Sequence, residues 1–150
     1  MKILMVCLGN ICRSPLAEGL LRHKAAEHGL QLEIDSAGTG GWHVGEAPDN
    51  RTIKNALKHG VDISKLRARQ IKQQDLELFD RIYVMDKSNL ANVRAIAKPE
   101  QLHKISLILD SISEDISEVP DPYYGGEESF ELVFKLLEKA SEAICQSLKA

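Results

Sequence analysis

The sequence has few cysteines, and their number and spacing argue against two classes of small protein. There are three cysteines in 150 residues, and no pair of them has the spacing of a zinc site. An odd count in so short a chain makes a disulfide framework unexpected, and a reducing compartment fits this composition. The histidines form no ligand cluster either, so we expect no metal.

Long hydrophobic runs and an excess of positive charge are also absent. The 19 basic and 22 acidic residues give a net charge of −3, which does not suit the basic face of a nucleic-acid-binding protein. No apolar run approaches the roughly 20 residues of a membrane-spanning helix. Met1 is not followed by the charged and apolar segments of a signal peptide. We therefore expect no nucleic-acid partner, no membrane insertion and a cytoplasmic location.

Short apolar runs alternate with helical patterns along the chain, which is typical of an α/β fold. The predicted strands cover residues 2–6, 32–36, 81–85 and 104–107. The predicted helices cover residues 15–28, a segment from 50 to about 60, residues 73–78, a segment after 86, and a last segment that includes 130–144. This order predicts a single domain, residues 1–150, with a small doubly wound, four-stranded parallel sheet in flavodoxin-like order and helices on both faces. Ligands bind such sheets beyond the carboxyl ends of the strands.

The most informative segment is Cys-Leu-Gly-Asn-Ile-Cys-Arg-Ser-Pro, residues 7–15, which joins the first predicted strand to the first predicted helix. A loop that enters a helix presents backbone N–H groups and the positive end of the helix dipole, which together bind oxyanions. Arg13 adds a two-pronged donor for phosphate oxygens. The same positive field favours the thiolate form of Cys7. The segment therefore predicts a sulfur nucleophile placed against a phosphate group.

This segment resembles the Cys-x5-Arg-Ser loop of protein tyrosine phosphatases, and its position near the N-terminus resembles the low-molecular-weight branch, whose bacterial-type members resemble this chain in their short loop around Trp42. A second segment, Asp-Pro-Tyr-Tyr-Gly at residues 121–125, resembles the general-acid loop of the same family. The resemblance implies a phosphotyrosine-protein phosphatase that hydrolyses phosphate monoesters through a cysteinyl-phosphate intermediate, with no metal and no cofactor. It implies phosphotyrosine-containing proteins as partners, among them tyrosine kinases of polysaccharide export or host proteins.

The resemblance also assigns the catalytic roles. Cys7 attacks phosphorus, and Arg13 holds the phosphoryl oxygens together with the loop N–H groups. The phosphate-binding residues are Leu8, Gly9, Asn10, Ile11, Cys12 and Arg13. Asp121 protonates the leaving oxygen and then activates water, although a turn aspartate is the simpler interpretation of Asp121 taken alone.

Four polar residues are expected to support the loop: Asn10, Ser14, Ser36 and Asp86. The resemblance gives Asn10 the role of holding the loop and Ser14 that of donating to the Cys7 thiolate. A helix cap is an equally good interpretation of Ser14, with Pro15 at the first helical position, and a cap also suits Asp86.

Aromatic residues are expected to line the pocket, namely Trp42, Tyr123 and Tyr124. The only tryptophan, Trp42, lies in a glycine-rich segment that suits neither a helix nor a strand, where an aromatic side chain commonly serves as a contact surface. An anchor for the loop is the alternative for Trp42.

Cys12 lies in the same loop as Cys7, which suggests a reversible disulfide that protects the nucleophile from further oxidation. A space-filling residue is the alternative. Cys145, in the last predicted helix, is interpreted as a buried apolar residue.

Three other functions are possible for a chain with this fold or loop. Arginine phosphatases of this family carry threonine where the chain has Ile11, and an apolar Ile11 favours an aromatic ester. Arsenate reductases need two further cysteines after the third strand, and the chain has none between Cys12 and Cys145. A non-catalytic redox-sensing or anion-binding module would have no use for Asp121.

Overall fold

The first strand is buried on both faces and forms the centre of the sheet. In the computed structural model, which describes residues 1–149, β1 (Lys2–Cys7) pairs with β2 (Glu33–Gly38) on one side and with β3 (Arg81–Val84) on the other. β4 (Ile105–Leu107) pairs with β3, which gives a parallel sheet of order β2-β1-β3-β4. The predicted α/β fold with flavodoxin-like strand order is confirmed.

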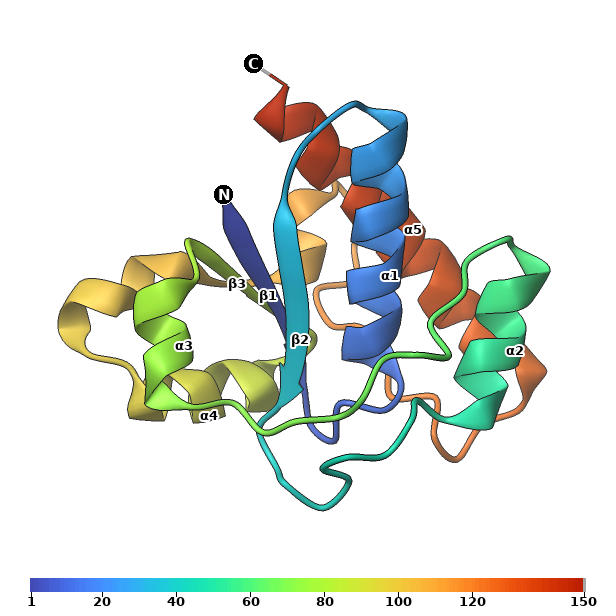
Figure 1. Ribbon diagram of the computed structural model, residues 1–150, viewed down its shortest axis with the longest axis horizontal. Helices are drawn as coiled ribbons and strands as arrows, with labels where there is room; N and C mark the ends of the chain where they lie inside the picture. The colour runs from blue at the N-terminus through green and yellow to red at the C-terminus, as the bar shows by residue number, and fades with distance from the viewer. Residues whose placement is uncertain (150) are drawn as a thin grey trace.

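Helices cover the sheet on both sides (Figure 1). α1 (Arg13–Glu27) and the long α5 (Glu127–Leu148) pack together on one side, and α2 (Asn50–Lys58) packs against α5. α3 (Gln73–Leu78) and α4 (Lys87–Ile96) lie on the opposite side. No helix in the described part of the chain is long and apolar enough to cross a membrane.

The side chains of β1 alternate between the two cores, as the pleat of a strand requires. Ile3, Met5 and Cys7 belong to the larger core, which includes buried side chains of α1 and α5. Leu4 and Val6 belong to the smaller core on the other face. The alternation therefore directs the side chain of Cys7 toward the α1 side of the sheet.

The start of α1 differs from the sequence-based prediction. The helix begins at Arg13, and its N-cap is Cys12, without a side-chain cap. The backbone N–H of Leu16 donates to the Cys12 carbonyl at 3.3 Å, which closes the first turn earlier than predicted. The predictions of Ser14 as the helix cap and Pro15 as the first helical residue were wrong. Pro15 is tolerated inside the first turn because an N–H there has no helical acceptor.

Three further features differ from the prediction. β2 extends to Gly38 because its pairing with β1 continues to Cys7, and Gly38 also forms an isolated bridge with Gln70. Two 3-10 helices, η1 (Pro99–Lys104) and η2 (Ile108–Ser111), flank β4 and had no counterpart in the predicted elements.

Candidate active site

The loop between β1 and α1, residues 7–13, places a sulfur atom among unpaired donors. Cys7 is the last residue of the central strand and is 3% exposed. Its Sγ accepts from the backbone N–H of Asn10 at 3.3 Å and lies 3.0 Å from Ser14 Oγ. Within residues 1–149, the N–H groups of Gly9, Ile11 and Cys12 donate to no backbone or side-chain acceptor. A loop of free N–H groups at the start of a helix suits an oxyanion.

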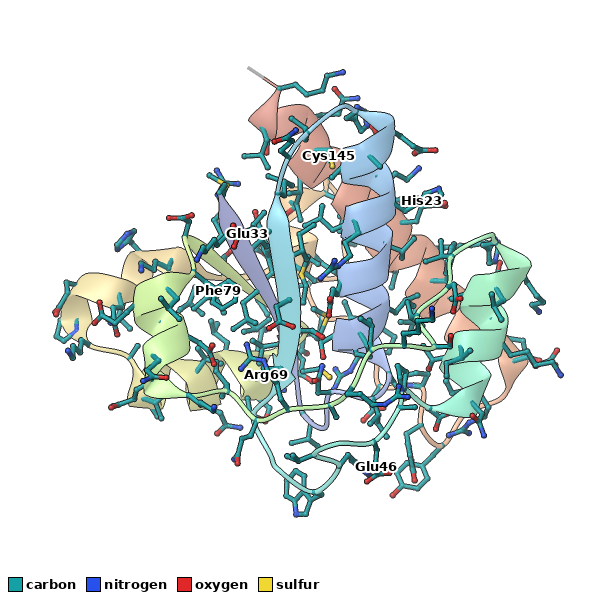
Figure 2. The ribbon with its side chains drawn as sticks, viewed as in Figure 1. His23, Glu33, Glu46, Arg69, Phe79 and Cys145 are labelled. Carbon is teal, nitrogen blue, oxygen red and sulfur yellow. The ribbon has the colours of Figure 1, made fainter. Side chains whose placement is uncertain are left out.

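Asn10 fixes the shape of this loop. Its φ of 58° is in the left-handed region, which asparagine tolerates better than most residues. Its Nδ2 donates to Ser14 Oγ at 2.7 Å and to Ser36 Oγ at 3.0 Å, and its Oδ1 accepts from the Arg69 backbone N–H at 3.0 Å. Figure 2 shows Arg69 beside the end of β2. The side chain of Asn10 thus faces into the protein, away from the cavity described below.

The hydrogen bonds from Asn10 determine whether the neighbouring hydroxyls of Ser14 and Ser36 donate or accept. Because both hydroxyls accept from Asn10, each keeps its hydrogen for another acceptor. Ser36 donates to the carboxylate of Glu18 at 2.7 Å, and the Ser14 hydroxyl has two acceptors in reach, the Cys7 sulfur at 3.0 Å and the Ala37 carbonyl at 3.5 Å. Glu18 is 2% exposed, and burial raises its pKa despite the bonds from Ser36 and Arg22.

Glu18 was not among the predicted site residues. It lies four positions after Ser14 on α1, so both side chains occupy one face of the helix. An acidic residue on a helix face with the apolar Leu21 and Ala25 is the signal that could have identified it.

Arg13 connects the loop to the segment that carries Asp121. Its Nη1 donates to Asp86 at 2.7 Å and to the Val119 carbonyl at 3.0 Å, and its Nη2 lies 3.9 Å from Asp121 Oδ2. Burial disfavours the charged form, but the nearby Cys7 and Asp86 groups outweigh it and raise the pKa of Arg13 above its ordinary value. Arg13 therefore stays charged while it is buried.

Asp86 has two contacts, one for each carboxylate oxygen. Oδ2 accepts from Arg13, and Oδ1 accepts from the N–H of Asn89 at 2.8 Å as part of the cap of α4. Both sequence-based interpretations of Asp86, a cap and a support for the loop, thus correspond to contacts in the structure.

A cavity of about 280 Å³ opens above the loop. It is lined by Cys7, Leu8, Gly9, Ile11, Cys12, Arg13, Trp42, His43, Asp121, Tyr123 and Tyr124. The structure therefore brings the predicted nucleophile, cation, acid and aromatic residues to one cavity, while Asn10, Ser14, Ser36 and Asp86 lie beneath or behind it. His43 was not among the predicted pocket residues; its Cδ2 lies 3.0 Å from where a Cβ on Gly9 would stand, so it packs close to the loop.

Asp121 lies on the exposed side of this cavity. Its side chain is 49% exposed, and its Oδ1 accepts from the N–H of Tyr123 at 3.0 Å. The opposite oxygen faces Arg13. This arrangement leaves the carboxyl group accessible both to a leaving group and to water.

Cys12 and Cys7 lie in the same loop but differ in environment. Within the described chain all three cysteines are free and buried. Burial raises the pKa of the Cys12 thiol to about 12. Cys12 is therefore a thiol at neutral pH. Among residues 1–149 no cluster of His, Cys, Asp and Glu side chains is suited to hold a metal ion.

Comparison with known proteins gives consistent matches over nearly the whole chain. The family model of the low molecular weight phosphotyrosine protein phosphatases matches residues 2–150. The protein YfkJ of Bacillus subtilis, a low molecular weight protein-tyrosine-phosphatase, is 41% identical over 150 residues, which cover 98% of this chain and 95% of YfkJ. The crystal structure of a protein tyrosine phosphatase from Entamoeba histolytica is 37% identical with a TM-score of 0.96, covering 99% of this chain and 97% of that one. The structure of a Drosophila arginine phosphatase is 34% identical with a TM-score of 0.94, covering 100% and 99% of the two chains.

Proposed function

The chain belongs to the low molecular weight phosphotyrosine protein phosphatase family, and from this premise we propose that it hydrolyses phosphotyrosine at the cavity above residues 7–13. The observation that carries the proposal is the convergence of the Cys7 sulfur, the Arg13 guanidinium and the Asp121 carboxyl on one cavity of about 280 Å³. These groups supply what phosphoryl transfer needs: a nucleophile, charge stabilisation and a proton donor.

The first step transfers the phosphoryl group to sulfur. The free N–H groups of the loop and the Arg13 guanidinium hold the phosphoryl oxygens, and the Cys7 thiolate attacks phosphorus opposite the phenolic oxygen. As the P–S bond forms and the P–O bond breaks, Asp121 gives its proton to the leaving oxygen. The Ser14 hydroxyl, 3.0 Å from Sγ, stabilises the thiolate before attack and as the leaving group in the next step.

The second step regenerates the enzyme. Asp121, now a carboxylate, takes a proton from water as the water oxygen attacks phosphorus. The P–S bond breaks, and inorganic phosphate and the Cys7 thiolate are released. The exposed position of Asp121 supports this second role because water reaches it from bulk solvent.

The direct test is hydrolysis of para-nitrophenyl phosphate in EDTA and reducing agent by the wild type and Cys7→Ser. We expect turnover in the wild type and a loss of at least about 10⁴-fold in Cys7→Ser, because the hydroxyl is a far weaker nucleophile at neutral pH. Cys145→Ser is the matched control and should retain activity. Turnover by Cys7→Ser close to the wild-type rate would overturn the proposal.

Phosphotyrosine rather than phosphoarginine is the proposed substrate. Ile11 lines the cavity without a hydroxyl to position water on a phosphoramidate, and Trp42 and Tyr123 offer apolar walls to an aromatic ring. We expect kcat/KM for phosphotyrosine to exceed that for phosphoarginine. Ile11→Thr should reduce the ratio of these two kcat/KM values. A higher value for phosphoarginine in the wild type would instead favour the function named for the Drosophila neighbour.

Phosphoproteins are the partners that the family implies. We propose tyrosine kinases of polysaccharide export as the finer choice and the cytoplasm as the location. Dephosphorylation of such a kinase's phosphorylated tail by the wild type, with Cys7→Ser as a trapping variant, tests the partner, and cell fractionation tests the location.

We further propose that Cys7 and Cys12 form a protective disulfide. Peroxide oxidises the Cys7 thiolate to a sulfenic acid, and the Cys12 sulfur then displaces water to form the disulfide. Peroxide should inactivate the wild type reversibly, and Cys12→Ser irreversibly, as measured by activity after thiol treatment. Full recovery of Cys12→Ser would contradict this role.

A further inference from the structure

A second cavity of about 330 Å³ lies beside the active site, between α2 and the start of α5. We call it the basic groove; the side chains that line it are Arg51, Lys54, Asn55 and Lys58 from α2, and Glu127 and Phe130 from α5. The main chain connects the two cavities directly, because Tyr123 and Tyr124 line the first, and the next residues, Gly125 and Gly126, line the second. A substrate segment bound at one cavity is therefore within reach of the other.

Arg51 forms the wall between the cavities. Its guanidinium lies over the ring of Tyr123, 5.3 Å from the centroid, and over the ring of Phe130, 4.7 Å from the centroid. Its charge is already paired with Asp49, whose oxygens accept from Arg51 at 3.0 Å. Arg51 thus contributes mainly shape, and the charge of the groove comes from other residues.

Lys54 and Lys58 provide that charge. They lie four residues apart on α2, so both line the same side of the groove. Within residues 1–149, no carboxylate lies within 4.0 Å of either ammonium group, and Glu127 is the one acidic side chain in the lining. The start of α5 adds the positive end of a 22-residue helix. The two unpaired lysines therefore outnumber the one glutamate of the lining, although Lys58 also lines the adjoining cavity that contains Glu127, Glu128 and Glu131.

Asn55 also lines the groove, and its amide is bonded to α5. It is 6% exposed, and its Nδ2 donates to Glu131 at 2.9 Å, which fixes the orientation of the amide. Among the described residues no group donates to its Oδ1. That oxygen has less than 1 Å² of accessible surface, so it is not available to a ligand in the groove. The polar recognition by the groove therefore comes from Lys54 and Lys58.

We propose that the basic groove binds acidic side chains of the substrate within a few residues of the phosphotyrosine, and so selects among phosphoproteins. This inference rests on the proposed phosphatase function. Lys54 and Lys58 are then specificity-determining residues. They contact the segment that flanks the phosphotyrosine, whereas residues 7–13 bind the reacting phosphate.

The test uses phosphotyrosine peptides that carry glutamates on the N-terminal or the C-terminal side, each with a glutamine counterpart. At low ionic strength, the wild type should cleave at least one acidic peptide with a kcat/KM about fivefold above its counterpart, as exposed ion pairs contribute on that scale. Lys54→Gln/Lys58→Gln should abolish the advantage. Lys54→Glu/Lys58→Glu should reverse it in favour of lysine-flanked peptides.

Two controls separate the possible failures. Lys98→Gln/Lys139→Gln makes the same change in net charge at two exposed lysines outside both cavities and should keep the preference. Para-nitrophenyl phosphate has no flanking segment, so all variants should hydrolyse it equally. A wild type inactive on this ester would refute the proposed function itself. An active wild type without acidic preference, or a preference that survives Lys54→Gln/Lys58→Gln, would overturn the role of the groove alone.

Discussion

The floor and the rim of the catalytic cavity differ most in how far their side chains are exposed to solvent. The floor is the loop of residues 7–13, in which Arg13 is 3% exposed and Asn10, whose side chain lies beneath the cavity, is 2% exposed; each makes hydrogen bonds to other elements. On the rim, Trp42 is 71% exposed and Tyr124 95%. A buried, fully bonded floor holds donors in place for charge that develops during reaction. An exposed rim can adapt to different substrates, so the comparison assigns chemistry to the floor and selection to the rim.

The largest effect is expected from the floor, at Arg13. Arg13→Lys removes the two-pronged donor and the tie between Asp86 and the Val119 carbonyl, so kcat for para-nitrophenyl phosphate should fall about 10³-fold. Steady-state kinetics measure the loss. Arg94→Lys, an exposed position on α4, is the matched control. A loss below about tenfold would mean that the floor does not carry the charge stabilisation.

Asp121 is exposed, as the rim residues are, but as the proposed general acid it takes part in the chemistry that the comparison assigns to the floor. Its substitution therefore tests whether exposure separates the two roles. Asp121→Asn should lower kcat about 10²-fold for phenyl phosphate and less for esters with better leaving groups. Asp115→Asn, an exposed neighbour in the same segment, serves as control. Equal losses for all leaving groups would argue against an acid.

Asn10 separates two contributions to the rigidity of the floor. Asn10→Gly keeps the left-handed backbone but loses three side-chain hydrogen bonds, which should lower the free energy of unfolding by about 3 kcal/mol. Asn10→Ala should cost about 1 kcal/mol more because alanine disfavours positive φ. Urea denaturation measures both, with exposed Asn92→Ala as control. Equal free energies of unfolding for the two variants would show that the left-handed backbone at residue 10 does not distinguish alanine from glycine.

The smallest effect is expected from the rim. Trp42→Ala should raise KM for aryl phosphates about fivefold through the lost ring contact. It should leave kcat unchanged and the free energy of unfolding within about 0.5 kcal/mol, as is usual for an exposed side chain. Val44→Ala, exposed in the same segment but outside the cavity, is the comparison. A large loss of stability would show that Trp42 anchors its loop, the alternative that its sequence context left open.

Most of the fold could be predicted because its signals are local. Strong apolar runs define the strands, and Gly29 and Gly60, which follow α1 and α2, have the positive φ that ends a helix. The start of α1 was misplaced because a polar residue before a proline is the usual sign of a cap, while here Ser14 is engaged by Asn10 and Cys7. Nothing in the sequence next to Ser14 shows that its hydroxyl is bound by side chains of the loop and is therefore not free to cap the helix.

The predicted site residues were those with a recognisable spacing, and those missed make contacts only in three dimensions. Glu18 reaches the loop through Ser36, and the Val119 carbonyl reaches it through Arg13, across 106 residues of sequence. A main-chain carbonyl has no sequence signature at all. The basic groove was missed for a similar reason, because Lys54 and Lys58 resemble any exposed pair on a helix until α5 is placed against them.

The burial of two of the cysteines has a practical consequence for counting functional molecules. Burial raises the pKa of Cys12 and also that of Cys145, which lies far from the loop, where α5 packs near the other end of α1 (Figure 2). At neutral pH both remain poorly reactive thiols, whereas an anionic alkylating reagent is drawn to Cys7 by the same donors that hold phosphate. Incorporation of iodoacetate should therefore stop at one group per intact chain and be blocked by inorganic phosphate. The labelled fraction then gives the concentration of competent active sites in a preparation, independently of any substrate.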